Sequence, residues 1–224
     1  MKKMLLLVLA SWLVFCTLQT DAGKETTSAP TAATAVDRLL EGNNRYMRYE
    51  PIHPDESRSR RKELTKGQHP YAVVVTCSDS RVSPELVFDQ GLGDLFVIRT
   101  AGNIMGDIEL GSIEYAVQHL NVPLIMLVGH EGCGAIGAYL KGEHASGHLK
   151  TIVDSIAAES EIKALQVKGD QILDHFVKAN IQHGVREIIQ SSPVIRERIA
   201  SGSLTVMGAY ERLENGKVEP LNGN

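Results

Sequence analysis

The segment 124-LIMLVGHEGCGAIGAYL-140 joins an apolar run to a glycine-rich turn and the start of a helical pattern. A run of this kind is typical of a buried strand in a parallel sheet, and a helix after its carboxyl end is the repeating unit of α/β folds. The turn has two competing interpretations. Its glycines match the G-x-G-x-x-G pattern of dinucleotide-binding turns, whereas His130 and Cys133 are candidate zinc ligands.

Two similar apolar runs precede this segment, YAVVVT at 71–76 and LFVIR at 95–99. Helical patterns separate them. One begins near Pro84, a residue suited to the first turn of a helix, and another covers 107–120, with acidic residues at its start that suit the helix dipole. Strand and helix alternating in this way predict an α/β fold, with a central, mainly parallel β-sheet flanked by helices.

The remaining patterns complete this domain. Residues 36–49 place apolar side chains at helical spacing, and helices are predicted to dominate 150–165 and 170–200. The segment 204–221 has the pattern of a strand, an Asn215-Gly216 turn and a short return strand. No internal repeat or second domain boundary is evident.

The N-terminus has the pattern of a secretory signal peptide. Two lysines precede an apolar run from Met4 to Cys16, and a small-residue site follows near Ala22. The run is shorter than the ~20 residues that span a bilayer; a short buried helix is the alternative. We therefore expect export to a bacterial periplasm and a mature form without a membrane anchor. The predicted organisation is a signal peptide at 1–22, a flexible linker at 23–35 and a single zinc-dependent catalytic domain at 36–224.

The net charge and the cysteines limit which partners and which kinds of site are expected for this chain. The formal net charge of -4 gives no electrostatic reason to expect nucleic acid as a partner. Beyond the predicted signal peptide the chain keeps Cys77 and Cys133, for which a structural disulfide is one interpretation in an oxidising compartment. However, Cys77 ends one predicted strand, and His130 and Cys133 follow another. Because the carboxyl ends of parallel strands meet at one edge of a sheet, these three residues can form a Cys2His zinc site with a fourth position open for catalysis.

Asp79 and Arg81 follow Cys77 in the sequence CSDSR. An arginine can pair bidentately with a carboxylate and hold it away from a metal; an ordinary surface ion pair is the alternative. The dinucleotide interpretation additionally needs an acidic residue about 20 positions after the turn, at the tip of the next strand. Glu143 and Asp154 lie instead in loop-like and helical sequence, so the zinc interpretation is favoured.

C-x-D-x-R at Cys77, Asp79 and Arg81, combined with H-x-x-C at His130 and Cys133, resembles the β-class carbonic anhydrases. The similarity runs from about Val36 to Leu213 and includes 85-ELVFDQGLGDLFVIRTAGN-103. It implies an enzyme with one Zn²⁺ per subunit that reversibly hydrates CO2 to bicarbonate and a proton, using hydroxide formed from zinc-held water. It also implies a homodimer or a dimer of dimers, with the active site at the subunit interface and the helix at 36–49 reaching across to the partner.

The resemblance also assigns roles to single residues. Asp79 and Arg81 are implied as catalytic, Gln68 as a hydrogen-bond donor to substrate, and Phe96, Ala101 and Gly134 as residues of the substrate pocket. Some family members bind the aspartate to zinc in a closed, inhibited form, which we associate with a tryptophan at the position of Val74. We therefore expect the open form, in which Arg81 holds Asp79.

Two alternatives remain for the function. A hydrolase of carbonyl sulfide or carbon disulfide would use the same zinc site, and no residue excludes it. A non-catalytic zinc-binding protein has no need of Asp79 and Arg81, so their presence argues against it.

Overall fold

The computed structural model describes residues 30–142 and 145–221. The predicted signal peptide, 1–22, and most of the predicted linker, 23–35, lie outside these ranges. Across the described residues, no helix is both long enough and apolar enough to cross a membrane.

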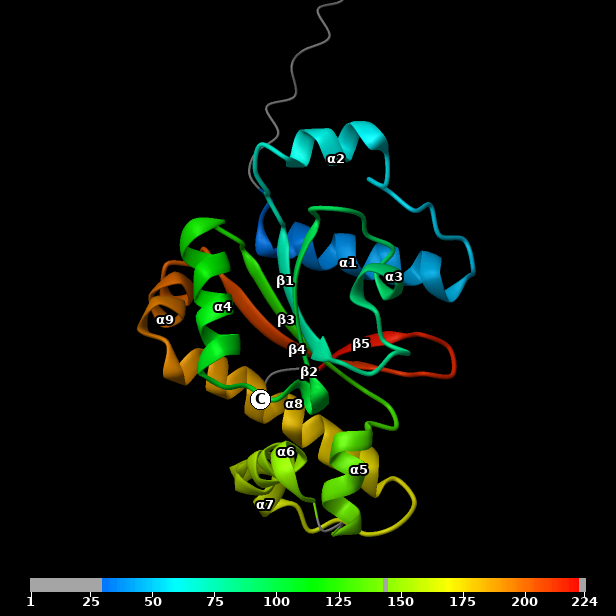
Figure 1. Ribbon diagram of the computed structural model, residues 1–224, viewed down its shortest axis with the longest axis vertical. Coiled ribbons are helices and arrows are strands. Elements are labelled where there is room, and N and C mark those ends of the chain that lie inside the picture. Colours follow the sequence, from blue (N-terminus) through cyan, green and yellow to red (C-terminus); the bar gives the residue numbers. More distant parts are fainter. Residues whose placement is uncertain (1–29, 143–144, 222–224) are drawn as a thin grey trace, which may run out of the picture.

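A five-stranded sheet forms the centre of the molecule, in the order β2-β1-β3-β4-β5 (Figure 1). Neighbouring strands from β2 to β4 are parallel, and β5 is antiparallel to β4. Every residue of β1 and β3 is buried, as expected for central strands covered on both faces. The predicted mainly parallel sheet is therefore confirmed. The strands are β1 (Ala72–Cys77), β2 (Leu95–Thr100), β3 (Leu124–His130), β4 (Thr205–Glu211) and β5 (Val218–Leu221).

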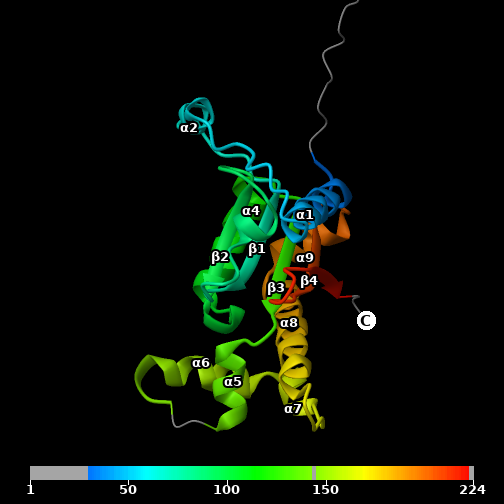
Figure 2. The ribbon, with the colours of Figure 1, turned by 90° about the vertical axis from the view of Figure 1, so that its right-hand side faces the viewer.

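Helices cover both faces of the sheet. On one face, Val74 and Met126 pack with Leu39 of α1; on the other, Val75 and Leu127 pack with side chains of α4, α5, α8 and α9. Figures 1 and 2 show α5, α6 and α7 beyond the carboxyl ends of the strands. The helices are α1 (Ala32–Met47), α2 (Arg58–Leu64), α3 (Pro84–Val87), η1 (Ala101–Asn103), α4 (Asp107–His119), α5 (Gly134–Lys141), α6 (Gly147–Ala158), α7 (Ser160–Ala164), α8 (Ile172–Ser191) and α9 (Pro193–Ala200).

Element boundaries differ from the prediction where local capping decides them. The first helix begins at Ala32 rather than at Val36, so the last four positions of the predicted linker are helical. The reason is a reciprocal cap, in which Thr31 and Thr34 each accept a hydrogen bond from the other's backbone N–H. The helical region predicted at 170–200 consists of two helices, which separate where Ser192 is extended and Pro193 starts a new first turn.

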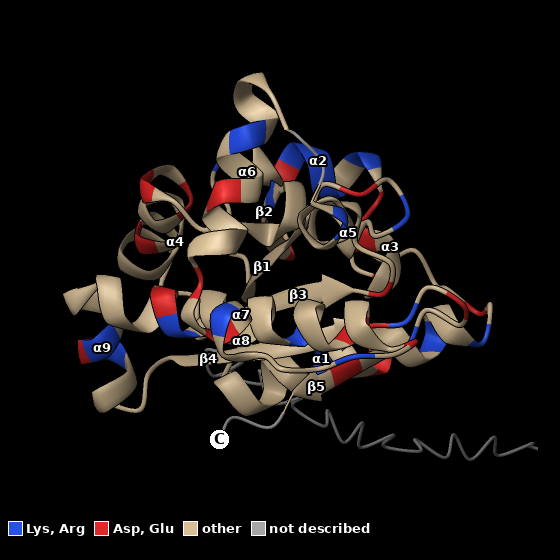
Figure 3. Ribbon diagram, turned by 90° about the horizontal axis from the view of Figure 1, so that it is seen from below, with Lys and Arg blue, Asp and Glu red and all other residues tan. Residues whose placement is uncertain are grey.

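Helix α2 was not predicted from the sequence, and it buries none of its residues. Its sequence, RSRRKEL, contains mostly basic residues, which appear in blue in Figure 3. The predicted C-terminal hairpin is present, with Gly216 in the left-handed region at φ +70°, where glycine has no steric penalty.

Candidate metal centre

Three candidate ligands meet at the carboxyl ends of β1 and β3. Cys77 is the last residue of β1, His130 the last of β3, and Cys133 caps the start of α5. β1 and β3 are adjacent parallel strands, and this adjacency brings residues distant in sequence to one point. The ligand atoms of the three side chains all lie within 4.8 Å of one another. All three residues are buried.

The orientation of His130 suits a metal. Its Nδ1 lies 2.9 Å from the carbonyl oxygen of Glu131, and a protonated Nδ1 donates to that oxygen. Nε2 then carries the lone pair, and it is buried without a hydrogen-bond partner in the part of the chain that the structure describes. Metal-binding histidines commonly donate their second ring N–H to a carbonyl in this way. An orphaned imidazole nitrogen beside two thiols is the donor set that zinc prefers.

The two sulfurs form an acidic thiol pair. A hydrogen bond from Cys133 lowers the pKa of Cys77 to about 4 against the opposing effect of burial, and His130 and the Gly102 N–H add to the lowering. The same hydrogen bond, together with burial, raises the pKa of Cys133. Without a cation the pair therefore retains one proton, and a bound cation would take its place. Gly102 donates its N–H to Cys77 Sγ over 3.3 Å.

Asp79 lies beside these ligands, and Arg81 holds it. Arg81 Nε donates to Asp79 Oδ1 at 2.9 Å and Nη2 to Oδ2 at 2.7 Å, which is a bidentate pair. The hydrogen bonds from Arg81 keep the pKa of Asp79 well below its usual range, so the carboxylate is ionised. Asp79 Oδ2 lies 4.0 Å from His130 Nε2. The carboxylate is therefore next to the ligand cluster but engaged by Arg81.

Arg99 supports this turn, and the sequence analysis did not identify it. Its Nη2 donates to the Asp79 carbonyl at 2.7 Å and its Nε to the Cys77 carbonyl at 3.1 Å. The only signal in the sequence was an arginine inside the apolar run LFVIR. Gly102 was missed for a different reason, since its contribution comes from the backbone.

The predicted substrate residues separate into two groups. Ala101 and Gly134 are next to the site, because Ala101 precedes Gly102 and Gly134 follows Cys133. Phe96 pairs with Val73, four positions before Cys77 on the neighbouring strand, and its ring lies 6.1 Å from that of Tyr115. Gln68 is exposed and precedes the amino end of β1. Their substrate roles stay predictions.

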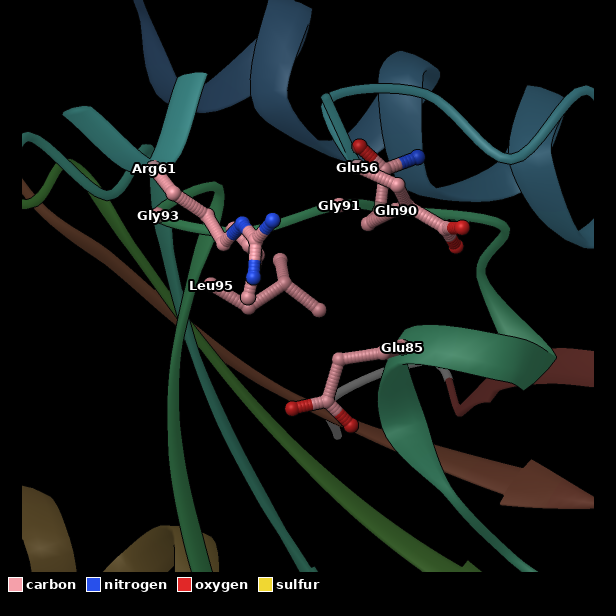
Figure 4. A pocket seen from close by; sticks show the side chains of 8 residues that line it. Glu56, Arg61, Glu85, Gln90, Gly91, Gly93 and Leu95 are labelled. Carbon is pink, nitrogen blue, oxygen red and sulfur yellow. The ribbon is translucent and has the colours of Figure 1, made fainter. Parts of the chain in front are cut away.

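A pocket of about 530 Å³ lies at the amino end of β2, away from the ligand cluster (Figure 4). Arg61 of α2, Glu85 of α3 and Leu95 of β2 are among its lining residues. This pocket and the exposed Gln68 lie toward the same end of the sheet.

The chain is similar to known carbonic anhydrases. Residues 72–218 match a family model described as carbonic anhydrase. Carbonic anhydrase 2 of Mycobacterium tuberculosis is 42% identical over 183 residues, which cover 80% of this chain and 87% of that protein. The solved β-carbonic anhydrase CcaA has a TM-score of 0.69 at 30% identity, covering 84% of this chain and 95% of that one. A tetrameric β-carbonic anhydrase from Sordaria macrospora has a TM-score of 0.66 at 28% identity, covering 84% and 97%.

Proposed function

Because the chain belongs to the β-class carbonic anhydrases, we infer that it catalyses the zinc-dependent, reversible hydration of CO2 to bicarbonate and a proton. The observation that carries this function is the buried Cys77–His130–Cys133 cluster with an ionised Asp79 beside it. These three side chains would hold Zn²⁺. Zinc in such a site lowers the pKa of bound water, and so supplies a nucleophile near neutral pH.

Asp79 and Arg81 have separate tasks in this proposal. An ionised carboxylate only accepts hydrogen bonds, so Asp79 can orient the attacking oxygen by accepting a hydrogen bond from it. Arg81 occupies both carboxylate oxygens and keeps Asp79 from becoming a fourth ligand. This arrangement supports the open form as the resting state, in which the remaining position would be free for water and the substrate would lie beside Ala101 and Gly134.

Stopped-flow measurement of CO2 hydration by the zinc-loaded protein tests the function. We expect catalysis that is absent from Cys77→Ser, in which one ligand is lost and the zinc content falls. A zinc-replete protein that does not accelerate CO2 hydration would exclude the function. Activity toward carbonyl sulfide under the same conditions would then identify the alternative substrate.

We further propose that the active site is completed by a second copy of the chain, in a homodimer or a dimer of dimers. Gln68 precedes Ala72, and the strand from Ala72 to Cys77 is about 16 Å long at the usual rise per residue. Gln68 therefore lies at the opposite end of the sheet from its own metal ligands. Apolar side chains are open to solvent at that end, where Leu92 is 46% exposed. The relative from Sordaria macrospora is described as tetrameric.

We propose that the protein is exported to a bacterial periplasm, and the signal-peptide pattern at 1–22 supports this proposal. Expression of the full chain in a Gram-negative host, followed by osmotic-shock fractionation and N-terminal sequencing, tests it. We expect the mature protein in the shock fluid with an N-terminus near residue 23. Full-length protein in the cytoplasm would contradict the proposal.

A further inference from the structure

Three buried polar side chains, Asn103, Asn180 and Glu159, form a hydrogen-bonded series from the metal centre to the junction of α6 and α7. We call this series the tether. Asn103 Nδ2 donates to Asn180 Oδ1 at 2.7 Å, and Asn180 Nδ2 donates to Glu159 Oε1 at 2.8 Å. Asn103 ends η1, Asn180 lies in the middle of α8, and Glu159 joins α6 to α7. None of the three residues is more than 3% exposed. The proposed reaction assigns no task to any of them.

The hydrogen bonds of the tether all run in one direction, from Asn103 through Asn180 to Glu159. Glu159 Oε1 accepts from Asn180, so Asn180 presents its amide nitrogen to Glu159 and its carbonyl oxygen to Asn103. Asn103 can then only donate. The carboxyl group thereby fixes how both amides are turned. The other carboxyl oxygen, Glu159 Oε2, is buried without a hydrogen-bond partner among the described residues.

At the end opposite Glu159, the tether holds an unusual turn formed by Gly102 and Asn103. Gly102 has φ +69° and Asn103 has φ +47°, so two consecutive residues are left-handed. Such a conformation is unfavourable for a residue with a side chain and persists where the surroundings determine it. The turn directs the Gly102 N–H to Cys77 Sγ at 3.3 Å. The tether therefore holds Asn103, which directly follows Gly102, the residue whose N–H bonds to the predicted metal ligand Cys77.

We propose that Asn180 and Glu159 are positioning residues of the metal centre, which act through Asn103 to hold the Gly102 N–H on the Cys77 sulfur. The proposal rests on the zinc site of the proposed function. A hydrogen bond to a thiolate stabilises its charge, and outer partners of this kind orient the ligand and tune the metal. The tether therefore affects the affinity for zinc and the electronic state of the Cys77–metal bond.

A structural role for Asn180 makes a different prediction. If Asn180 only satisfies the buried carboxyl group of Glu159, removing both residues together should restore zinc binding and part of the stability, because the carboxyl group is no longer left unpaired; the Asn103 amide still lacks its acceptor. If Asn180 positions the turn, the double variant should regain part of the stability while zinc binding stays weak.

The experiment measures zinc dissociation constants by chelator competition, together with unfolding temperatures. The variants are Asn103→Gly, Asn180→Leu and the double variant Asn180→Leu with Glu159→Met. Glycine at position 103 removes the side chain that the tether holds, and it adopts the positive φ of this position without steric strain. This variant keeps the test valid if Asn180→Leu fails to fold. Asn43→Leu is the matched control. Asn43 is equally buried, at 2%, and bonds to Val87 and Gly216 far from the turn.

We expect a rise of about tenfold in the zinc dissociation constant for Asn103→Gly, Asn180→Leu and the double variant, and none for Asn43→Leu. The double variant should regain part of the unfolding temperature lost by Asn180→Leu, because Asn103 stays without its acceptor in both. In cobalt-substituted protein, the thiolate-to-metal charge-transfer band should shift in the three tether variants only. Unchanged affinity in Asn103→Gly, recovered affinity in the double variant, or an equal loss in Asn43→Leu would each overturn the proposal. Metal binding is measured without CO2, so the proposed function can fail independently.

Discussion

The carboxylate of Asp79 is held ionised by the residue two positions later in the chain. Both of its oxygens accept hydrogen bonds from Arg81, and the backbone N–H of Arg81 donates to Oδ1 as well. Cys77, His130 and Cys133 could hold a metal without Asp79, so we expect the Asp79–Arg81 pair to act in the reaction rather than in metal binding. Binding and catalysis should therefore be separable by mutation.

Replacement of Asp79 by asparagine tests this separation. An amide has a similar shape, but it can no longer act as an ionised acceptor for the proton of the attacking oxygen. We expect the rate of CO2 hydration to fall by about 100-fold, with zinc content unchanged, as measured by stopped flow and metal analysis. Asp154→Asn is the control, because Asp154 forms an exposed ion pair with Lys150. Full activity in Asp79→Asn would exclude the assigned role.

Glu159 makes the stability of the protein depend on pH. Burial raises its pKa from 4.5 to about 7. Between these two values the folded protein binds this proton more tightly than the unfolded chain does, so stability decreases as the pH rises through that window. Glu159→Gln removes the effect while keeping an acceptor for Asn180.

The stabilisation of Glu159→Gln relative to the unchanged protein should therefore grow between pH 4.5 and pH 8. From the shift to about 7, the growth is at most about 3 kcal/mol. Urea unfolding of both zinc-loaded proteins across this range measures it, and effects of other groups cancel in the difference. A difference that is constant with pH would contradict the assignment.

At the scale of elements, α1 docks through a position that has room only for glycine. A Cβ on Gly42 would lie 1.7 Å from the carbonyl oxygen of Phe88, which is backbone and cannot rotate away. The next residue, Asn43, bonds to Val87, Gly216 and Val218 and so ties the helix to the hairpin. The contact fixes α1 against α3 and β5.

Gly42→Ala should therefore destabilise the protein by about 3 kcal/mol, the upper end of the usual cost of overpacking. Gly111→Ala in α4 is the matched control, because a Cβ there meets nothing within 4 Å. Alanine is the better helix former, so this control should gain about 0.5–1 kcal/mol. Denaturant unfolding distinguishes the two, and equal effects would show that the contact with Phe88 does not limit α1.

Which elements could be predicted depends on how much of each is buried. The three apolar runs became β1, β2 and β3 with boundaries shifted by at most two residues. β1 and β3 are central and fully buried, and composition alone marks such strands. The helix α2 was missed, since it buries no residue and so shows no apolar periodicity. The prediction of helices over 150–165 did not place the break at Glu159 between α6 and α7. At this break the Glu159 side chain accepts a hydrogen bond from Asn180 of α8, a tertiary contact that the local sequence does not encode.

At the scale of the whole molecule, the parallel sheet explains why the ligands were predictable and the tether was not. Cys77 and His130 end two adjacent parallel strands, Cys133 follows three residues after His130, and adjacency of the strands brings these positions together. Asn103 and Asn180 are 77 positions apart on a turn and a helix. Their contact depends on how α8 lies over the sheet, and no spacing rule gives that.

The same sheet places Gln68 and Asp79 at opposite ends of β1, and this leads to a prediction about the assembled enzyme. If Gln68 serves the site of a partner subunit, Gln68→Ala and Asp79→Asn impair different halves of each composite site. A mixed dimer then contains one site with both residues intact. Random exchange of subunits between the two purified variants should therefore restore about a quarter of the full activity, because half of the dimers are mixed and each has one intact site. Activity equal to the average of the separate variants would show that every site takes both residues from a single chain.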